Sequence, residues 1–173
     1  MFSALLLVLF GATGQAQSLE DADRLFNQGQ YAEALSAVDA ARSEAVGTGA
    51  DDLTLAVHDN TRGLILTALG RHEESVLVFE SVVAYLESAD MEEQMPTVLM
   101  NLANSWEFLG ELARARAHMD RALTILGASE DADQAAIGDI LIQAAALSAK
   151  GGDLAVALTQ MQRGLKLQAE VLG

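Results

Sequence analysis

The sequence of 173 residues contains no cysteine, one proline and few aromatic residues. Without cysteine there is no disulfide framework, no thiolate metal site and no thiol nucleophile, and nothing that indicates a redox compartment. The single proline, Pro96, leaves long stretches free to form helices, and Ala, Leu, Glu, Arg and Gln are abundant. No segment alternates with a period of two for long enough to predict a strand. The composition therefore predicts a helical protein.

Positive charge is also scarce, with 10 Lys and Arg residues against 25 Asp and Glu residues and a formal net charge of −15. Binding to phosphate groups needs clustered Lys and Arg, so the balance argues against nucleic acid as a partner. It argues equally against binding to an anionic membrane surface. Two interpretations stay open: the acidity keeps the protein soluble, or it offers an acidic face to a basic partner segment.

The chain does contain a short sequence motif that occurs at four places. Each copy begins with a glycine, which we call the lead glycine. The lead glycines lie 41, 40 and 42 residues apart, at Gly29, Gly70, Gly110 and Gly152. A fixed period of about 20–50 residues is the signature of a stacked repeat array. Such arrays are usually binding scaffolds, so the repeat bears on function as well as on fold.

Each repeat is predicted to be two helices joined at the lead glycine, which can adopt the left-handed conformation that ends a helix. The predicted first helices span residues 19–28, 52–69, 95–109 and 133–150, and the second helices span 31–45, 72–88, 112–126 and 154–171. A small residue five places after each glycine should let the two helices approach closely: Ala34, Ser75, Ala115 and Ala157. An apolar residue two places after the glycine should fold back over the turn: Tyr31, Leu112 and Leu154.

The links between repeats are polar and acidic, as in Ala50-Asp51-Asp52 and Ala132-Asp133. Carboxylates just ahead of a helix suit the positive end of its dipole, and Pro96 suits a first turn. These clusters therefore have a local structural explanation, and none follows the spacing of a calcium-binding loop.

The first 16 residues are predicted to be a signal peptide. Residues 1–17 carry no charged side chain, and 4–10 form an apolar run that is too short to span a bilayer. Gly14 and Ala16 fit a cleavage site before Gln17. No Lys or Arg precedes the apolar run, and a buried first helix is the alternative. The absence of cysteine near the cleavage point excludes a lipid-anchored lipoprotein. We expect an exported protein, periplasmic or secreted, with no membrane insertion after cleavage.

Small and apolar residues recur at fixed offsets around the four glycines, most clearly in the third repeat. There they are Leu99, Leu102, Ala103, Trp106, Gly110, Leu112, Ala115, Met119 and Ala122. This pattern resembles the tetratricopeptide repeat (TPR), whose usual period is about 34 residues. The longer period here, and the segment 97–103 with its Asn101, are similar to the kinesin light chain type of repeat. The resemblance covers roughly residues 19–172.

The resemblance implies an all-α fold, an α-solenoid of about four antiparallel helix-turn-helix repeats in a right-handed superhelix. After the signal peptide at 1–16, the repeat domain would occupy 17–173, with repeats at about 17–47, 51–90, 94–128 and 132–173. No capping helix with a polar outer face is evident after the fourth repeat, although arrays generally need one. A partner, dimerisation or further sequence beyond the given chain would then cover that end.

No catalytic constellation is present, and no catalytic, metal or cofactor site is predicted. His72-Glu73 opens like a zinc-binding H-E-x-x-H motif, but Val76 occupies the second histidine position. His58 and His118 have no metal-ligand spacing to other residues, and phosphate and dinucleotide motifs are missing. Trp106 falls in a packing column, while Phe108 falls on another face of the same helix.

In this family the first helices of successive repeats line a concave groove. The resemblance places these residues in the groove: Phe26, Asn60, Leu64, Thr67, Asn101, Asn104, Glu107, Phe108 and Gln143. Asn and Gln side chains each offer a donor and an acceptor, which suits binding to a peptide backbone. Asn101 matches the asparagine of the kinesin light chain type. The Lys and Arg clamp of chaperone-binding members is absent, since Leu64 and Thr97 are among the residues at its positions.

The sequence thus predicts a non-enzymatic scaffold that holds an extended peptide or a helix, with a basic partner segment as one alternative. Two other functions stay open. The array could be the regulatory or accessory region of a larger, protease-like protein, or it could be an oligomeric spacer without a groove ligand. A homo-oligomer through the uncapped fourth repeat is a further possibility.

Overall fold

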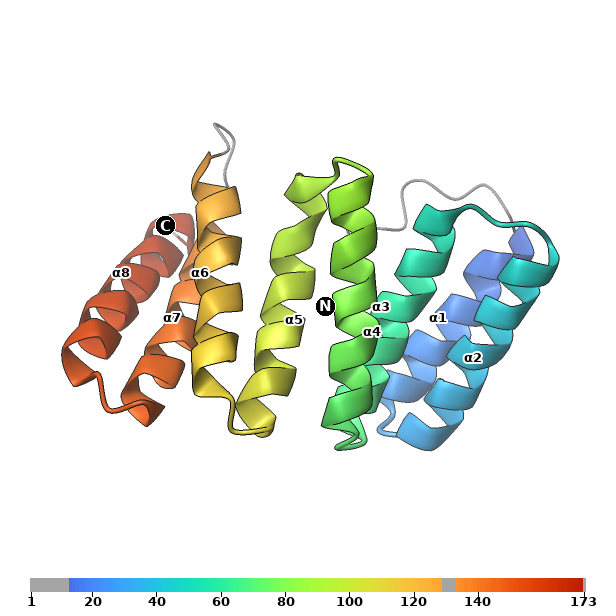
Figure 1. Cartoon of the computed structure of the whole chain (residues 1–173), viewed down its shortest axis with the longest axis horizontal. Coiled ribbons are helices and arrows are strands. Elements are labelled where there is room, and N and C mark those ends of the chain that lie inside the picture. Colours follow the sequence, from blue (N-terminus) through green and yellow to red (C-terminus); the bar gives the residue numbers. More distant parts are fainter. Residues whose placement is uncertain (1–12, 129–132, 173) are drawn as a thin grey trace. The chain divides into compact units, whose positions relative to one another are not determined.

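The computed structural model describes residues 13–128 and 133–172, with side chains described for 19–128 and 133–171. Within these ranges it contains eight α-helices, one short 3-10 helix and no strand, which confirms the all-α prediction (Figure 1). In chain order the elements are α1 (Thr13–Asn27), α2 (Tyr31–Gly47), α3 (Asp52–Ala68), α4 (His72–Ser88), η2 (Glu92–Gln94), α5 (Met95–Phe108), α6 (Leu112–Ala128), α7 (Gln134–Lys150) and α8 (Leu154–Leu172).

The chain divides into two compact units, the first ending at Val78 and the second beginning at Phe79, so the boundary lies inside α4. In the first unit α1 packs on α2, and α2 packs on α3. In the second unit α5 packs on α6, α6 on α7 and α7 on α8, and the last of these contacts is the most extensive. These consecutive helices are therefore neighbours within their units, as a helical-repeat array requires.

The lead glycines form the turns for which the sequence selects them. Gly29 has φ 74°, and the amides of Gly29 and Gln30 donate to the carbonyl oxygens of Phe26 and Leu25 at 2.9 and 3.0 Å. This is the Schellman arrangement, in which a left-handed residue lets two amides satisfy the last carbonyls of a helix. The same pattern, with φ between 73° and 86°, occurs at Gly70, Gly110 and Gly152. The predicted role of these glycines is confirmed.

Two links between repeats use the same turn, which the sequence pattern did not reveal. Gly49 has φ 74°, and Ala50 N–H donates to the carbonyl of Ala45 at 2.9 Å. Asp90 adopts φ 54°, a left-handed conformation that short polar side chains tolerate better than most. The corresponding positions of the third link, 129–132, lie outside the described residues.

Side-chain caps account for two of the acidic links. The Asp51 carboxylate accepts a hydrogen bond from Thr54 N–H at 2.8 Å, and hydrogen bonding to the side chain and then to the backbone of Thr54 lowers the pKa of Asp51. The Asp133 carboxylate accepts from the amides of Ala135 and Ala136 at 2.9 and 3.1 Å. Each aspartate therefore begins a helix by satisfying backbone donors that have no partner inside it.

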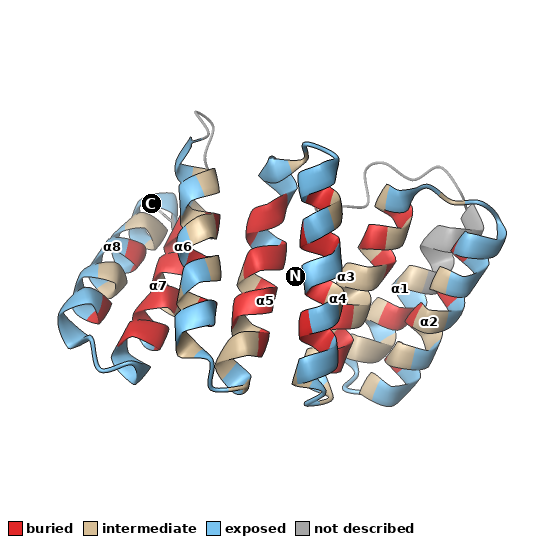
Figure 2. Cartoon of the chain, in the orientation of Figure 1, coloured by how far each residue is buried: buried red, intermediate tan, exposed pale blue. Residues whose placement is uncertain are grey.

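Small residues occupy the contact between paired helices. The residues five places after the lead glycines are 0% exposed at Ala34, Ser75 and Ala115 and 9% exposed at Ala157. The prediction that these positions permit close approach is confirmed. Figure 2 shows α8 as largely exposed, whereas α5 and α7 are largely buried.

One predicted contact is wrong. Leu154 was expected to fold back over its turn, but its side chain is 70% exposed. Tyr31, at the equivalent position, does fold back, and its ring centroid lies 5.3 Å from that of Phe26. The helix before Gly152 ends with Ala149 and Lys150, which offer no large apolar surface to Leu154.

The apolar run of the predicted signal peptide, residues 4–10, lies outside the described residues. The first helix begins at Thr13, six residues before the predicted start at Leu19.

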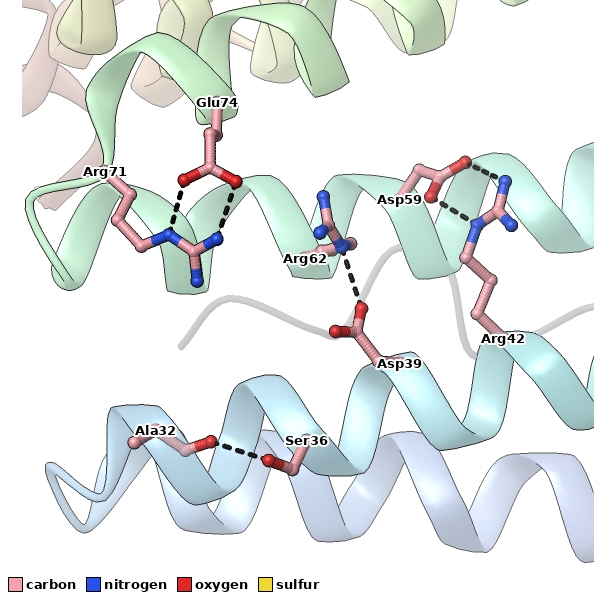
Figure 3. A network of polar contacts seen from close by, with 8 residues as sticks. All are labelled: Ala32, Ser36, Asp39, Arg42, Asp59, Arg62, Arg71 and Glu74. Atoms are coloured by element: carbon pink, nitrogen blue, oxygen red, sulfur yellow. Dashed lines mark hydrogen bonds and ion pairs between the residues drawn. The ribbon is translucent and has the colours of Figure 1, made fainter.

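The junction of α2 and α3 in the first unit is held by charged side chains, as Figure 3 shows. Arg42 donates to both carboxylate oxygens of Asp59, at 2.6 and 3.0 Å, and Arg62 donates to Asp39 at 2.8 Å. The two arginines lie on opposite helices, so each helix gives one cation and one anion. The hydrogen bond to Asp59 raises the pKa of Arg42 further above its ordinary value.

The α7–α8 pair in the second unit is held by close backbone contact instead. A Cβ atom added at Gly164 would lie 2.8 Å from the carbonyl oxygen of Gly138 and 2.8 Å from Cγ1 of Ile142. An added Cβ at Gly138 would lie 3.1 Å from the carbonyl oxygen of Gly164. The two glycines face each other across the pair. A side chain at Gly164 would force a shift of the backbone opposite, and one at Gly138 would require its neighbours to move by a few tenths of an ångström.

Candidate functional site

The structure places every predicted site residue on the first helix of a pair. Phe26 lies on α1, and Asn60, Leu64 and Thr67 lie on α3, all in the first unit. The remaining five belong to the second unit. Asn101, Asn104, Glu107 and Phe108 lie on α5, and Gln143 lies on α7.

In the second unit, two side-chain contacts join α5 directly to α7. Gln143 Nε2 donates to the thioether sulfur of Met100 at 3.2 Å, and the Lys150 ammonium pairs with the Glu107 carboxylate. Met100 and Glu107 are seven residues apart on α5, which is about two turns, and Gln143 and Lys150 are seven residues apart on α7. The two contacts therefore lie along one edge of this helix pair. We call the surface formed by Met100, Asn101, Asn104, Glu107 and Phe108 of α5 with Gln143 and Lys150 of α7 the α5–α7 face.

Two amide side chains of the α5–α7 face hold buried polar atoms without a partner. Asn101 is only 5% exposed, and its Nδ2 donor makes no hydrogen bond. Gln143 is half-buried, and its Oε1 acceptor likewise makes none. A buried polar group without a partner typically costs about 1–3 kcal/mol. The face therefore contains one unused donor and one unused acceptor, each at an energetic cost to the free protein.

The first unit repeats part of this arrangement. Asn60 is half-buried, and its Oδ1 is a buried acceptor with no hydrogen bond. Nearby on α3, Leu64 and Thr67 are half-buried, and Thr67 Oγ1 donates to the carbonyl of Gly63 at 3.0 Å. Phe26 packs on Tyr31 beside the core around Ala22, so at least part of its ring stabilises the fold.

The remaining predicted residues of the second unit differ in exposure. Asn104 and Glu107 are half-buried, whereas the Phe108 side chain is 68% exposed. An exposed aromatic ring beside buried amides resembles the usual composition of an interface, in which a few aromatic anchors contribute most of the binding energy. Phe108 is the large exposed apolar residue of the α5–α7 face.

Sequence reasoning did not include Met100 and Lys150 in the site. Each lies 43 residues from its partner, at Gln143 and Glu107 respectively, which is close to the repeat period. That shared separation is a signal that could have found both contacts. The period alone could not show which of several side chains on each helix turn toward each other.

Trp106 contributes to packing between α5 and α6. It is half-buried, and the Arg114 guanidinium lies over its ring at 4.5 Å from the centroid. Such a stack contributes about 0.5–1 kcal/mol at an exposed site. The contact joins the two helices of one pair, as expected for a residue in a packing column.

The histidines form no metal site in the described part of the chain, where no group of three His, Cys, Asp or Glu residues is placed to hold an ion. His58 is buried, and its Nδ1 lies 2.7 Å from the carbonyl oxygen of Thr54. Burial lowers the pKa of His118. Over the same described ranges, no helix has the length and apolar character needed to cross a membrane.

No protein-family model matches the sequence, and neither does any curated protein. Solved structures do match. BtubC (BKLC) from P. vanneervenii superposes with a TM-score of 0.81 at 20% identity, over 92% of this chain and 65% of that chain. A Podosopora anserina protein assigned as a kinesin light chain, with nearly identical TPR-like repeats, gives 0.77 at 17% identity, over 90% and 75%. MamA 41-end from Desulfovibrio magneticus RS-1 gives 0.69 at 13% identity, over 90% and 76%.

The chain has the TPR-like helical-repeat fold. The prediction of that fold from the four glycine-led motifs is confirmed, and so is the predicted likeness of the repeats to those of kinesin light chain. The identities lie at 20% or below, so they establish the fold and nothing finer. The chain spans 65% of the length of the BtubC chain that it matches.

Proposed function

We propose that this protein is a non-enzymatic scaffold that binds an extended peptide segment of another protein across the α5–α7 face. The observation that carries the proposal is the amide of Asn101, which is 5% exposed and has a donor without a partner. A donor retained at a cost to the free protein is expected at a binding site, where a ligand supplies the missing acceptor.

A peptide backbone has the matching chemistry. Each residue of an extended segment offers a carbonyl acceptor and an amide donor, which could pair with Asn101 Nδ2 and Gln143 Oε1 respectively. Both atoms are covered in the free protein, so each side chain has to turn to reach a ligand. Phe108, at 68% exposure, would then pack on an apolar side chain of the bound segment.

We propose further that the bound segment is basic. The chain carries a net charge of −15, and Glu107 is the acidic member of the α5–α7 face. A Lys or Arg of the ligand could replace Lys150 as the partner of Glu107. Exposed ion pairs are screened by salt, so the affinity for a basic segment should fall as ionic strength rises.

Peptides selected from a random display library against the full chain test this function. The double variant Asn101→Ala, Gln143→Ala should bind the selected peptides at least tenfold more weakly, because lost hydrogen bonds in a desolvated site cost about 1–3 kcal/mol. Arg163→Ala, an exposed change on α8, is the matched control and should bind as the wild type does. Circular dichroism would verify that all three proteins remain helical.

Two results would overturn the proposal. One is equal affinity of the wild type and the double variant for the same peptides. The other is a selection dominated by acidic peptides, or by peptides that Arg163→Ala no longer binds.

We also propose that the protein acts after export, with cleavage before Gln17. This rests on the apolar, uncharged leader and its small residues at Gly14 and Ala16. Intact-mass measurement of protein recovered outside the cytoplasm should show an N-terminus at Gln17 or within a few residues. A cytoplasmic protein that retains Met1 would contradict export.

A further inference from the structure

One ion pair joins α5 to α7 across the α5–α7 face, and its two members differ in exposure. The Glu107 side chain is 21% exposed, whereas the side chain of Lys150, which pairs with it, is 60% exposed. Glu107 is the only charged residue of α5. The acidic residue of α7, Asp139, is exposed and accepts a hydrogen bond from Gln168 on α8 at 2.6 Å. The face therefore contains a carboxylate that is set into its surface, with an exposed lysine as its partner.

The repeat itself does not require this ion pair. Glu107 stands three places before its lead glycine, and Lys150 stands two places before the next one. Elsewhere these two places carry no charge: three before the glycine the residues are Phe26, Thr67 and Ala149, and two before it they are Asn27, Ala68 and Phe108. An acid and a base occur there only on the two helices that form the α5–α7 face. The pair is therefore a feature of this face, and maintaining the repeat fold does not explain it.

Lys150 is the member of the pair that a ligand can displace. It is the last residue of α7, where the partial negative charge of the helix C-terminus favours a cation whether or not Glu107 is near. Its side chain is long and flexible, and exposed ion pairs contribute little to stability. Glu107 is mostly covered, and a charge with little access to water needs a partner. A ligand cation can therefore replace the Lys150 ammonium on Glu107 at little cost.

We propose that Lys150 occupies the place of a ligand cation in the free protein, and that a bound segment displaces it with a Lys or Arg side chain of its own. This inference rests on the peptide binding proposed above. Because Lys150 has to leave Glu107 first, it lowers the affinity for every basic segment. Arginine is favoured over lysine as the displacing residue, since a planar guanidinium can donate to both carboxylate oxygens at once. Lys150 is thus a specificity-determining residue of the α5–α7 face.

The repeat also determines how far the ligand cation has to reach. Asn101 and Gln143 each stand nine places before their lead glycines, so they occupy equivalent places on α5 and α7. Glu107 follows Asn101 by six residues, which is about 9 Å along the axis of α5. A segment that crosses the face at Asn101 and Gln143 therefore needs a long side chain to reach Glu107. Lys and Arg have such side chains, and a cation on a shorter stem does not reach.

The chain contains only two lysines, which permits a charge-matched test of Lys150. Peptides selected from the display library are titrated calorimetrically into the full-length variants Lys150→Met and Lys166→Met. Both changes remove one positive charge, and Lys166 pairs with Glu170 within α8. Lys150→Met should bind basic peptides about two- to fivefold more tightly than the wild type, because Glu107 then has no competing partner. Lys166→Met should bind them as the wild type does.

Changes in the peptide test whether its cation binds Glu107. Norleucine in place of the peptide's Lys or Arg keeps an apolar stem without the charge, and it should abolish the advantage of Lys150→Met. Diaminopropionic acid keeps the charge on a shorter stem, and that peptide should bind no better than the norleucine peptide. Glu107→Gln should weaken binding of the basic peptide by about two- to fivefold and make it insensitive to the norleucine change. A peptide with Arg at this place should bind more tightly than its Lys counterpart.

The outcomes separate this inference from the proposed function. If the selected peptides bind Asn101→Ala, Gln143→Ala as they bind the wild type, the proposed site is wrong and the role of Lys150 is overturned with it. If they depend on Asn101 and Gln143 but bind Lys150→Met and Lys166→Met equally well, peptide binding stands and only the role of Lys150 is overturned. Selected peptides that need no Lys or Arg would overturn it too, as would an equal gain in affinity of Lys150→Met for the norleucine peptide.

Discussion

The α2–α3 junction and the α7–α8 pair join helices by opposite means. Between α2 and α3, long side chains reach across the gap, with Arg42 on Asp59 and Arg62 on Asp39. Between α7 and α8 the backbones themselves approach at Gly138 and Gly164. Long charged side chains adapt to small shifts, and water screens their interaction. Close backbone contact has no such tolerance, since the packed interior resists any added volume. The two regions should therefore respond very differently to substitution.

The largest effect is expected at the backbone contact. Gly164→Ala adds a methyl group 2.8 Å from the carbonyl oxygen of Gly138, so α7 and α8 must separate. Overpacking of this kind typically costs about 1–3 kcal/mol. Gly127→Ala on α6 is the control, because a Cβ there has no neighbour within 4 Å. That change should be neutral or stabilise by up to about 1 kcal/mol through helix propensity. Urea unfolding followed by circular dichroism measures both, and equal midpoints would refute the assigned contact.

A second test asks whether the small residues at the turns pack as tightly as the two glycines. Ala115 is 0% exposed on α6, whereas Ala128 at the end of the same helix is exposed. Ala115→Leu should cost about 1–3 kcal/mol, and Ala128→Leu should change stability little. Thermal melting distinguishes them. Indistinguishable melting temperatures would show that the register of the α5–α6 pair is wrong.

The charged junction should be weaker and sensitive to salt. Arg42→Ala removes a bidentate pair with Asp59, whose side chain is 18% exposed, and should cost about 1 kcal/mol at low ionic strength. Arg24→Ala breaks an exposed pair with Asp21 on α1 and should cost less than about 0.5 kcal/mol. High salt should reduce the difference between the Arg42 variant and the wild type. A loss that salt does not change would indicate that the Arg42 side chain stabilises by packing.

The smallest effect concerns pH. Burial lowers the pKa of His118 below its ordinary value, and the positive charge of Arg121 acts in the same direction against the opposing field of Glu80. The unfolded chain therefore takes up a proton at a higher pH than the folded chain does. Stability should fall as the pH drops through the unfolded pKa of about 6.5, and this contribution should level off below the folded pKa. His118→Gln should flatten the dependence of the melting temperature on pH from about 7 downward, over the range between the unfolded and folded pKa values. If the pH dependence of the melting temperature is unchanged in this variant, titrating groups other than His118 cause it.

Much of the fold could be predicted because the turns depend on single residues. The glycine-led motifs predicted helices at 31–45 and 72–88, and the structure has helices at Tyr31–Gly47 and His72–Ser88. The contact of Gly138 with Gly164 could not be predicted, since glycine inside a helix is usually only a cost in propensity. Whether a glycine inside a helix stabilises the fold depends on which helix lies opposite it, and the sequence pattern does not show that.

The sequence predicted on which helices the candidate site residues lie. It did not predict how deeply they are buried or whether they have hydrogen-bond partners. The repeat period placed Asn101 and Gln143 on the first helices, where the structure has them. That Asn101 is 5% exposed, with a donor lacking a partner, depends on how neighbouring side chains pack. The contacts of Lys150 with Glu107 and of Gln143 with Met100 depend in turn on the rotation of α7 relative to α5.

The most direct test of the account is the substitution Asn101→Leu, which keeps the branching of the side chain and removes its polar atoms. If the amide is retained for a ligand, relieving the buried unpaired donor should stabilise the free protein by up to about 1 kcal/mol. That corresponds to a rise of about 2–4 °C in melting temperature for a chain of this size. The same variant should bind the selected peptides at least tenfold more weakly. A lower melting temperature together with unchanged peptide affinity would contradict the account, because the amide would then support the fold and not the ligand.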